Sequence, residues 1–531
     1  MNGMSAADET LDAALAAGPL TAADAAPAPD PEVEHRSTPR SEAFRRYIAD
    51  GWAPRPTELP PRLEAADLAA GRRERLAAQF PGQRLVFPAG EFRVRSNDTD
   101  YRFRPHSAFA HLTGLGLDRE PDAVLVLEPR PAGDPRGAGH DAVLYFRPRA
   151  ERDTEEFYAD ARYGELWVGV RPSLEEVAAE TGIETRHLDE LLDAIVKDLG
   201  EDGLLVRVVR GADERVEARL DEARQTVARA TAGATEESVT TADAELARAA
   251  SELRLIKDKW EIGQLRLAIE VTARGFEDIV AALPRATARS RGERVVEGVF
   301  AARAREEGNG TGYDTIAASG AHACTLHWIR NDGEVADGDL VLVDAGVEVD
   351  SLYTADVTRT LPVSGTFTEA QRRVYEAVLD AADAAFAIAR PGTRFGDLTE
   401  VAMKVIAARL GEWGLLPSTV EESLDPEGQY HRRWLVHGVS HHLGLDVHDC
   451  AKARKEMYLD AVLEPGMVFT IEPGLYFLPD DMLAPPEFRG IGVRIEDDVL
   501  VTETGCENLS GMLPRTVSQI EEWMQGLLRR G

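Results

Sequence analysis

Short apolar runs alternate with amphipathic stretches through the first half of the chain, and they predict one α/β domain over residues 41–245. Runs rich in β-branched and aromatic residues predict strands over residues 84–87, 123–128, 142–147 and 204–209. Helical spacing predicts helices over residues 174–180, 188–199 and 212–230, the first opened by the capping-box pair Ser173 and Glu176. The charged, Ala- and Thr-rich stretch 231–250 is expected to connect this domain to a second one, residues 246–531.

The second half shows the same order of elements twice. Predicted helices 260–283 and 292–306 precede a His-bearing segment and two apolar strands, which carry Asp344 and Asp356. Predicted helices 369–389 and 398–410 precede another His-bearing segment and two more strands, which carry Glu472 and Glu496. We therefore expect a pseudo-twofold internal repeat in which each half supplies two carboxylates to a shared cleft.

Composition narrows the class of protein. The chain carries 93 Asp and Glu against 60 Lys and Arg, a net charge of −33, which argues against nucleic acid or an anionic membrane as a partner. Residues 1–40 are rich in Ala, Pro, Asp and Thr and are expected to be a disordered tail. The start is acidic, no apolar run approaches about 18 residues, and the three cysteines are too few for a disulfide framework. These features predict a cytoplasmic protein.

Five side chains in the second half suit a two-metal site: Asp344, Asp356, His441, Glu472 and Glu496. Four carboxylates around one imidazole would repel one another unless divalent cations neutralised them. If the strands of Asp344 and Asp356 pair, the two carboxylates are expected to lie opposite each other on one face. Such a ligand set suits Mn²⁺, Co²⁺, Fe²⁺ or Zn²⁺. Two cations can lower the pKa of a shared water from 15.7 toward about 7, so the pattern predicts a hydrolytic centre.

Each of these residues alone has a simpler interpretation, as a strand-edge carboxylate or a hydrogen-bonded core histidine. The clustering of histidines favours the metal interpretation, since seven of the 12 fall within one segment. These seven are His322, His327, His431, His437, His441, His442 and His448.

Five motifs in order carry a family resemblance. They are D-A-G followed by D-V-T-R-T, then H-G-x-S-H-x-L-G-L-D-V-H-D, then E-P-G-L-Y, then G-V-R-I-E-D-D. The set resembles the proline-specific metallopeptidases of the pita-bread fold, most closely the Xaa-Pro aminopeptidase (aminopeptidase P) family. The resemblance implies a fold of class α/β (α+β), with a non-catalytic creatinase-like α/β domain before a pita-bread catalytic domain.

The resemblance also implies the cofactors and their ligands. Two divalent ions, most often Mn²⁺, would be held by Asp344 and Asp356 on one side and His441 on the other. Asp356 and Glu496 would bridge them. Glu472 would be a ligand and would also take the proton of the attacking water and pass it to the leaving nitrogen.

Further residues are assigned to the substrate by the same resemblance. His327, His437 and His448 would contact the peptide and support the tetrahedral intermediate, and His437 with Tyr476 would line the pocket for the proline ring. Arg494 lies two residues before Glu496 on a strand, hence on the same face, and is expected to pair with Asp356 or Glu496.

The predicted activity is removal of the first residue from peptides with proline in second position, by attack of a metal-activated hydroxide. Alternatives are an Xaa-Pro dipeptidase (prolidase), a methionine aminopeptidase and a non-catalytic module that binds peptides. The resemblance also implies a homo-oligomer, dimer or tetramer. In the family an aromatic residue from a neighbouring subunit often reaches the active site; the matching position here is Ala110, beside His111, so that aromatic is missing.

Overall fold

The structure is a computed structural model that describes residues 38–200, 203–231 and 236–529. Most of the predicted tail, residues 1–37, lies outside the described residues. The chain forms two compact units. One combines residues up to Pro56 with Arg149–Arg171, and its helices are α1 Glu42–Ala49, α4 Glu155–Ala159 and α5 Glu165–Val168. The other unit, Thr57–Pro148 with Pro172–Gly531, contains everything that follows here.

A five-stranded sheet organises the first part of this larger unit, in the order β6-β5-β4-β1-β7. The strands are β1 Arg84–Pro88, β4 Val124–Pro129, β5 His140–Phe146, β6 Glu184–His187 and β7 Val206–Val208. Helices α2 Ala66–Ala77, α3 Ser107–Thr113, α6 Leu174–Thr181 and α8 Glu214–Thr231 and the hairpin β2 Val94–Ser96 with β3 Thr99–Asp100 accompany it. The four predicted strands are confirmed, and Ser173 and Glu176 form the predicted capping box.

One prediction in this part is wrong. The predicted helix 188–199 is only a turn, η1 Leu188–Glu190, and a short helix, α7 Leu191–Ala194. The guanidinium of buried Arg84 donates to the carbonyls of Ile195 and Lys197, at 3.0 and 2.7 Å, and holds this stretch in a non-helical path. The stretch expected to connect the two domains is largely helix α9 Glu236–Glu252, and its Leu246 and Ala250 are buried in the core beside the five-stranded sheet.

The second part holds the predicted repeat of helices and strands. Its first half contains α10 Lys259–Thr287, α11 Gly292–Glu307, β8 Gly310–Thr311, β9 Ile316–Ser319, η3 Gly320–Cys324, β10 Leu340–Ala345, β11 Val347–Glu348 and β12 Val357–Pro362. Its second half contains α12 Glu369–Ile388, α13 Phe395–Glu412, α14 Val420–Leu424, η4 Tyr430–Arg433, η5 Lys455–Met457, β13 Val468–Ile471, β14 Gly474–Tyr476, β15 Gly492–Arg494, β16 Asp497–Val501, β17 Cys506–Asn508 and α15 Val517–Leu528. All four predicted helices are confirmed.

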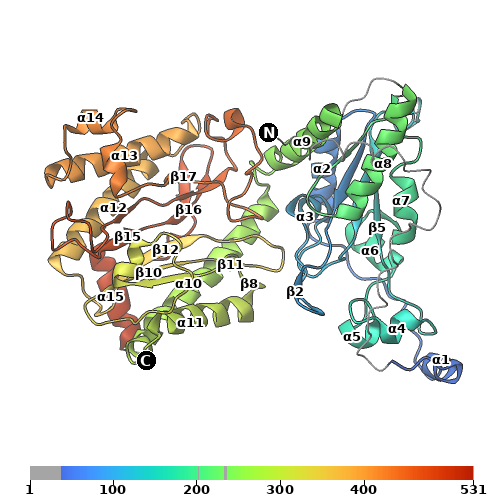
Figure 1. Ribbon diagram of the computed structural model, residues 1–531, viewed down its shortest axis with the longest axis horizontal. Helices are drawn as coiled ribbons and strands as arrows, with labels where there is room; N and C mark the ends of the chain where they lie inside the picture. The colour runs from blue at the N-terminus through green and yellow to red at the C-terminus, as the bar shows by residue number, and fades with distance from the viewer. Residues whose placement is uncertain (1–37, 201–202, 232–235, 530–531) are drawn as a thin grey trace, which may run out of the picture. The chain divides into compact units, whose positions relative to one another are not determined.

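Small antiparallel sheets lie between the helix pairs of the two halves. Strands β12-β10-β9 form one sheet and β13-β16-β17 another, with β14-β15 and β11-β8 as two-stranded ribbons. Figure 1 shows these strands between α10 and α11 on one side and α12 and α13 on the other. Within the described residues no helix is long and apolar enough to cross a membrane.

Candidate active site

The first two carboxylates come from the hairpin of β10 and β12. The register pairs Asp344 with Thr358, so Asp356, just before β12, lies one step beyond the ladder. The two aspartates are therefore not directly opposite each other as expected, because β11 and a turn at Leu352 occupy the chain between them. They still meet at one group, since the Tyr313 hydroxyl lies 2.7 Å from Asp344 Oδ1 and 2.5 Å from Asp356 Oδ1.

The other two carboxylates lie where the chain leaves one strand for another. Glu472 follows β13, and Glu496 stands between β15 and β16. The Glu496 amide donates to the Thr358 carbonyl at 3.1 Å, and the Thr358 hydroxyl donates to Glu496 Oε2 at 2.7 Å. These bonds join the strand of one half to the strand of the other and place Glu496 next to Asp356.

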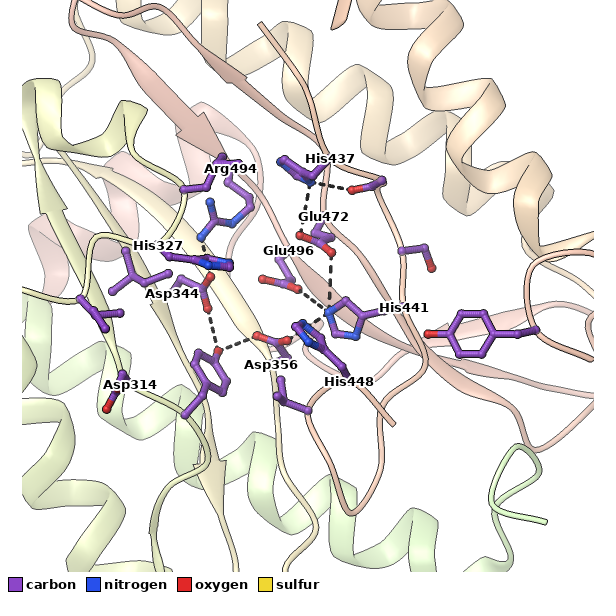
Figure 2. A pocket seen from close by; sticks show the side chains of 18 residues that line it. Asp314, His327, Asp344, Asp356, His437, His441, His448, Glu472, Arg494 and Glu496 are labelled. Atoms are coloured by element: carbon purple, nitrogen blue, oxygen red, sulfur yellow. Dashed lines mark hydrogen bonds and ion pairs between the residues drawn. The ribbon is translucent and has the colours of Figure 1, made fainter. Parts of the chain in front are cut away.

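His441 completes the cluster. Its Nε2 lies 3.3 Å from Asp356 Oδ2, 3.6 Å from Glu472 Oε1 and 3.9 Å from Glu496 Oε1. All five predicted ligands line one cavity of about 660 Å³, and Figure 2 shows their side chains turned toward one another. Ligand atoms of Asp356, His441 and Glu496 all lie within 4.8 Å of one another, which suits a shared metal ion.

The pKa values of these groups indicate whether the cluster suits divalent cations. Burial raises the pKa of Asp344, raises that of Glu472 to about 7, and, with neighbouring carboxylates adding, raises that of Glu496 well above its usual value. Burial alone would lower the pKa of His441, but Asp356 and Glu472 outweigh it and raise the pKa to about 9. A cluster that keeps protons when alone is suited to divalent cations, which replace that positive charge.

Arg494 has a different partner from the one expected. Its guanidinium pairs with Asp344 Oδ2, while Nε donates to the Thr358 hydroxyl at 3.1 Å and Nη1 to the Tyr476 hydroxyl at 3.2 Å. The expected pairing with Asp356 or Glu496 is wrong, because β15 ends at Arg494 and Glu496 lies in the break before β16, so the two residues do not share one strand. Arg494 thus fixes a predicted metal ligand of the other half.

Three further histidines stand around the cluster. His327, His437 and His448 line the cavity (Figure 2). His437 Nε2 lies 2.9 Å from the Tyr476 hydroxyl, and the His448 ring stands edge-on to His441 with centroids 4.5 Å apart. Burial, helped by the charge of Arg494, lowers the pKa of His437 to about 4, and burial lowers that of His448.

Not every clustered histidine belongs to the site. His322 contacts Glu293, His431 contacts Ser423, and His442 is stacked on Phe395, so these three are structural. The clustering of histidines in the sequence therefore suggests a larger site than the structure has, because the cluster contains both cavity-lining and structural histidines. Sequence reasoning also missed Tyr313, whose only signal is a lone aromatic three residues before the buried strand β9.

Comparison with known proteins fits this geometry. The model of metallopeptidase family M24 matches residues 263–503, and that of the aminopeptidase P N-terminal domain matches residues 69–205. Xaa-Pro aminopeptidase 1 of Streptomyces coelicolor is 49% identical over 488 residues, 92% of this chain and 93% of that one. This chain belongs to the Xaa-Pro aminopeptidase family. The family makes it a hydrolase of the metallo-aminopeptidase class.

Solved structures support the fold of this family member. Aminopeptidase P from Escherichia coli, in its low-pH form, superposes with a TM-score of 0.74 at 32% identity, covering 88% of this chain and 99% of that one. The Escherichia coli Xaa-Pro aminopeptidase sequence is 35% identical, covering 85% and 96%. The predicted α/β (α+β) class, with an N-terminal α/β domain before a pita-bread catalytic domain, is confirmed.

Proposed function

We propose that the chain removes the first residue from peptides whose second residue is proline, using two divalent metal ions. The observation that carries the proposal is the single cavity that brings Asp344, Asp356, His441, Glu472 and Glu496 together in a member of this family. Asp344 and Asp356 would hold one ion and His441 the other, with Asp356 and Glu496 shared. The carboxylate-rich set favours Mn²⁺, with Co²⁺, Fe²⁺ or Zn²⁺ as alternatives.

When bound, the two ions would activate a water and polarise the scissile carbonyl. Glu472 would move the proton, and this role is supported by its carboxylate, which lines the cavity beside His441 with Oε2 3.9 Å from His437 Nδ1. Cleavage of a peptide bond to proline requires that a proton be delivered to the leaving nitrogen, since this nitrogen carries no hydrogen of its own.

The remaining side chains hold the peptide. His327, His437 and His448 would donate to the substrate and to the oxyanion that develops on its carbonyl. His437 and Tyr476, joined by a hydrogen bond, would line the place of the proline ring. Arg494 would keep Asp344 oriented rather than touch the substrate.

A length series tests the proposal. The metal-reconstituted protein should release alanine from Ala-Pro-Ala and act poorly on Ala-Ala-Ala. Cleavage of Ala-Pro alone would identify a prolidase, and binding of Ala-Pro-Ala without cleavage a peptide-binding module. Its failure to cleave any of the three peptides would refute the proposal.

Oligomeric state and cellular location stay predictions. The position at which the family often presents an aromatic to a neighbouring subunit is Ala110, which is 5% exposed and buried in one cluster with Leu265 and Tyr353 of its own chain. Light scattering on the purified protein would test the expected dimer or tetramer.

A further inference from the structure

One acidic side chain of the cavity has no part in the ligand cluster. Asp314 follows Tyr313 and lines the same cavity, yet its side chain is exposed. Within the described part of the chain it has no hydrogen bond or ion pair to another residue. An acidic group that faces a substrate cavity without a partner is free to receive a cation from the substrate.

Three apolar side chains, those of Ile316, Leu326 and Ile329, line the same cavity as Asp314. The segment that carries Ile329 lies alongside the one that carries Asp314, because the Asn331 side chain donates to the Thr315 carbonyl at 2.8 Å and accepts from the Ala317 amide at 3.0 Å. This end of the cavity therefore offers apolar walls and a terminal negative charge.

The position of Asp314 relative to the ligand cluster determines which part of a bound peptide lies near it. The Tyr313 hydroxyl touches Asp344 and Asp356, so Asp314 lies about the length of a tyrosine side chain from the cluster. Figure 2 shows Asp314 and His437 on opposite sides of the cluster. With the scissile carbonyl at the cluster and the proline ring toward His437, as the proposed function requires, the first residue's side chain extends toward Asp314.

The distance from the cluster to Asp314 is too long for the free α-amino group of the substrate to pair with Asp314. This group is two bonds from the scissile carbonyl carbon and stays at the cluster, whereas a long side chain spans the distance. We propose that Asp314 selects substrates whose first residue is lysine or arginine. Their methylene stems would lie against Ile316 and Ile329, and their charged heads would pair with the Asp314 carboxylate.

The test compares each basic first residue with a neutral one of the same shape. The quantity measured is the ratio of kcat/KM for Lys-Pro-Ala to that for norleucine-Pro-Ala, and for Arg-Pro-Ala to that for citrulline-Pro-Ala. For the metal-loaded wild type at low salt we expect ratios on the order of fivefold, the size an accessible ion pair supports. They should fall toward one in Asp314→Asn and in about 1 M salt, which screens the pair.

A matched control separates the local charge from the net charge. Asp337→Asn removes one exposed carboxylate outside the cavity and should leave both ratios unchanged. Asp314→Lys should favour Glu-Pro-Ala over Gln-Pro-Ala. A wild type that cleaves Ala-Pro-Ala without preferring basic residues, or an Asp314→Asn variant that keeps the preference, would overturn this inference alone. An equal loss in Asp337→Asn would also overturn it, and a protein that cleaves no Xaa-Pro peptide would overturn the proposed function with it.

Discussion

A single phenol holds two of the carboxylates in the cavity. The Tyr313 hydroxyl lies within hydrogen-bond distance of Asp344 and Asp356, and burial together with these carboxylates raises its pKa well above the usual value. It therefore remains a protonated donor throughout the working pH range. A donor fixed between two carboxylates sets the direction in which both present their remaining oxygens.

Replacing Tyr313 with Phe should weaken metal binding. Loss of a group that orients a metal ligand typically lowers metal affinity by about 10- to 100-fold. Calorimetric titration of Mn²⁺ into the chelator-treated variant would measure the change. Tyr430→Phe, at a 44% exposed position outside the cavity, is the matched control. Equal affinities in wild type and Tyr313→Phe would contradict the role assigned to the hydroxyl.

His448→Ala should separate substrate contact from metal ligation. We expect full metal occupancy by elemental analysis and a loss of about 10²–10³ in kcat on Ala-Pro-Ala, the usual effect of removing one oxyanion donor. Purification with half the metal would make His448 a ligand. Unchanged rate and metal content would make it an ordinary core histidine.

The four carboxylate ligands could be found from sequence because each lies within or next to an apolar run, where an unpaired charge is costly. That argument depends only on local sequence. It says nothing about Tyr313, which lies outside any strand, and it gave the wrong partner for Arg494. The partner of the Arg494 guanidinium depends on the break between β15 and β16, which no local pattern encodes.

At the scale of elements, one buried carboxylate on helix α11 fastens the segment that carries His327. Glu293 accepts from the amides of Ser319 and Gly333 at 2.8 and 2.7 Å and from Trp328 Nε1 at 2.9 Å. His322 Nδ1 lies 2.8 Å from it as well. Both ends of the segment are thus tied to one side chain, and His327 lies between them.

Glu293→Gln should loosen this segment, because an amide cannot accept all four donors. Leaving buried donors unpaired costs about 1–3 kcal/mol each, so the melting temperature should fall. The KM for Ala-Pro-Ala should rise while Mn²⁺ affinity stays unchanged, since no predicted ligand lies on the segment. Glu306→Gln, exposed on the same helix, is the control. A variant with the wild-type KM would show that Glu293 supports only the fold.

The elements predicted correctly are those with local causes. Thr368 and Gln371 cap α12 as Ser173 and Glu176 cap α6, and such pairs are visible in the sequence. The wrong helix after Leu188 fails for a long-range reason, the guanidinium of Arg84 more than a hundred residues earlier. The buried face of α9 likewise becomes visible only once the sheet exists.

For the whole molecule, the metal ions should be part of the stability. Without them, Asp344, Asp356, Glu472 and Glu496 face one another in a single cavity. We expect a lower melting temperature after chelation and recovery on adding Mn²⁺, because a ligand that binds only the folded state stabilises it. An unchanged melting curve, after elemental analysis confirms metal loss, would argue against a carboxylate-bridged pair.

Stability should also fall in acid, in part through His106. Burial, with Arg254 and Lys452 adding, lowers its pKa to about 4, against about 6.5 in an unfolded chain. Between these values the unfolded state binds more protons, so the free energy of unfolding falls as pH falls from about 6.5 to about 4, by about 3 kcal/mol at most.

Thermal unfolding of His106→Asn at pH 7 and pH 5 tests this. Asn can keep the helix cap that His106 provides to Ala108, so the melting temperature should depend less on pH than in wild type. His187→Asn is the control, since His187 caps Asp189 in the same way on the surface. The same pH dependence in wild type and His106→Asn would refute the assignment.

The placement of ligands at strand ends in both halves has a consequence for assembly. A chain cut at the exposed Ser364, between β12 and α12, would leave Asp344 and Asp356 on one fragment and His441, Glu472 and Glu496 on the other. Neither fragment would contain all five predicted metal ligands. Binding of Mn²⁺ by the mixture of fragments, and by neither fragment alone, would then show that the two fragments associate into a complete site.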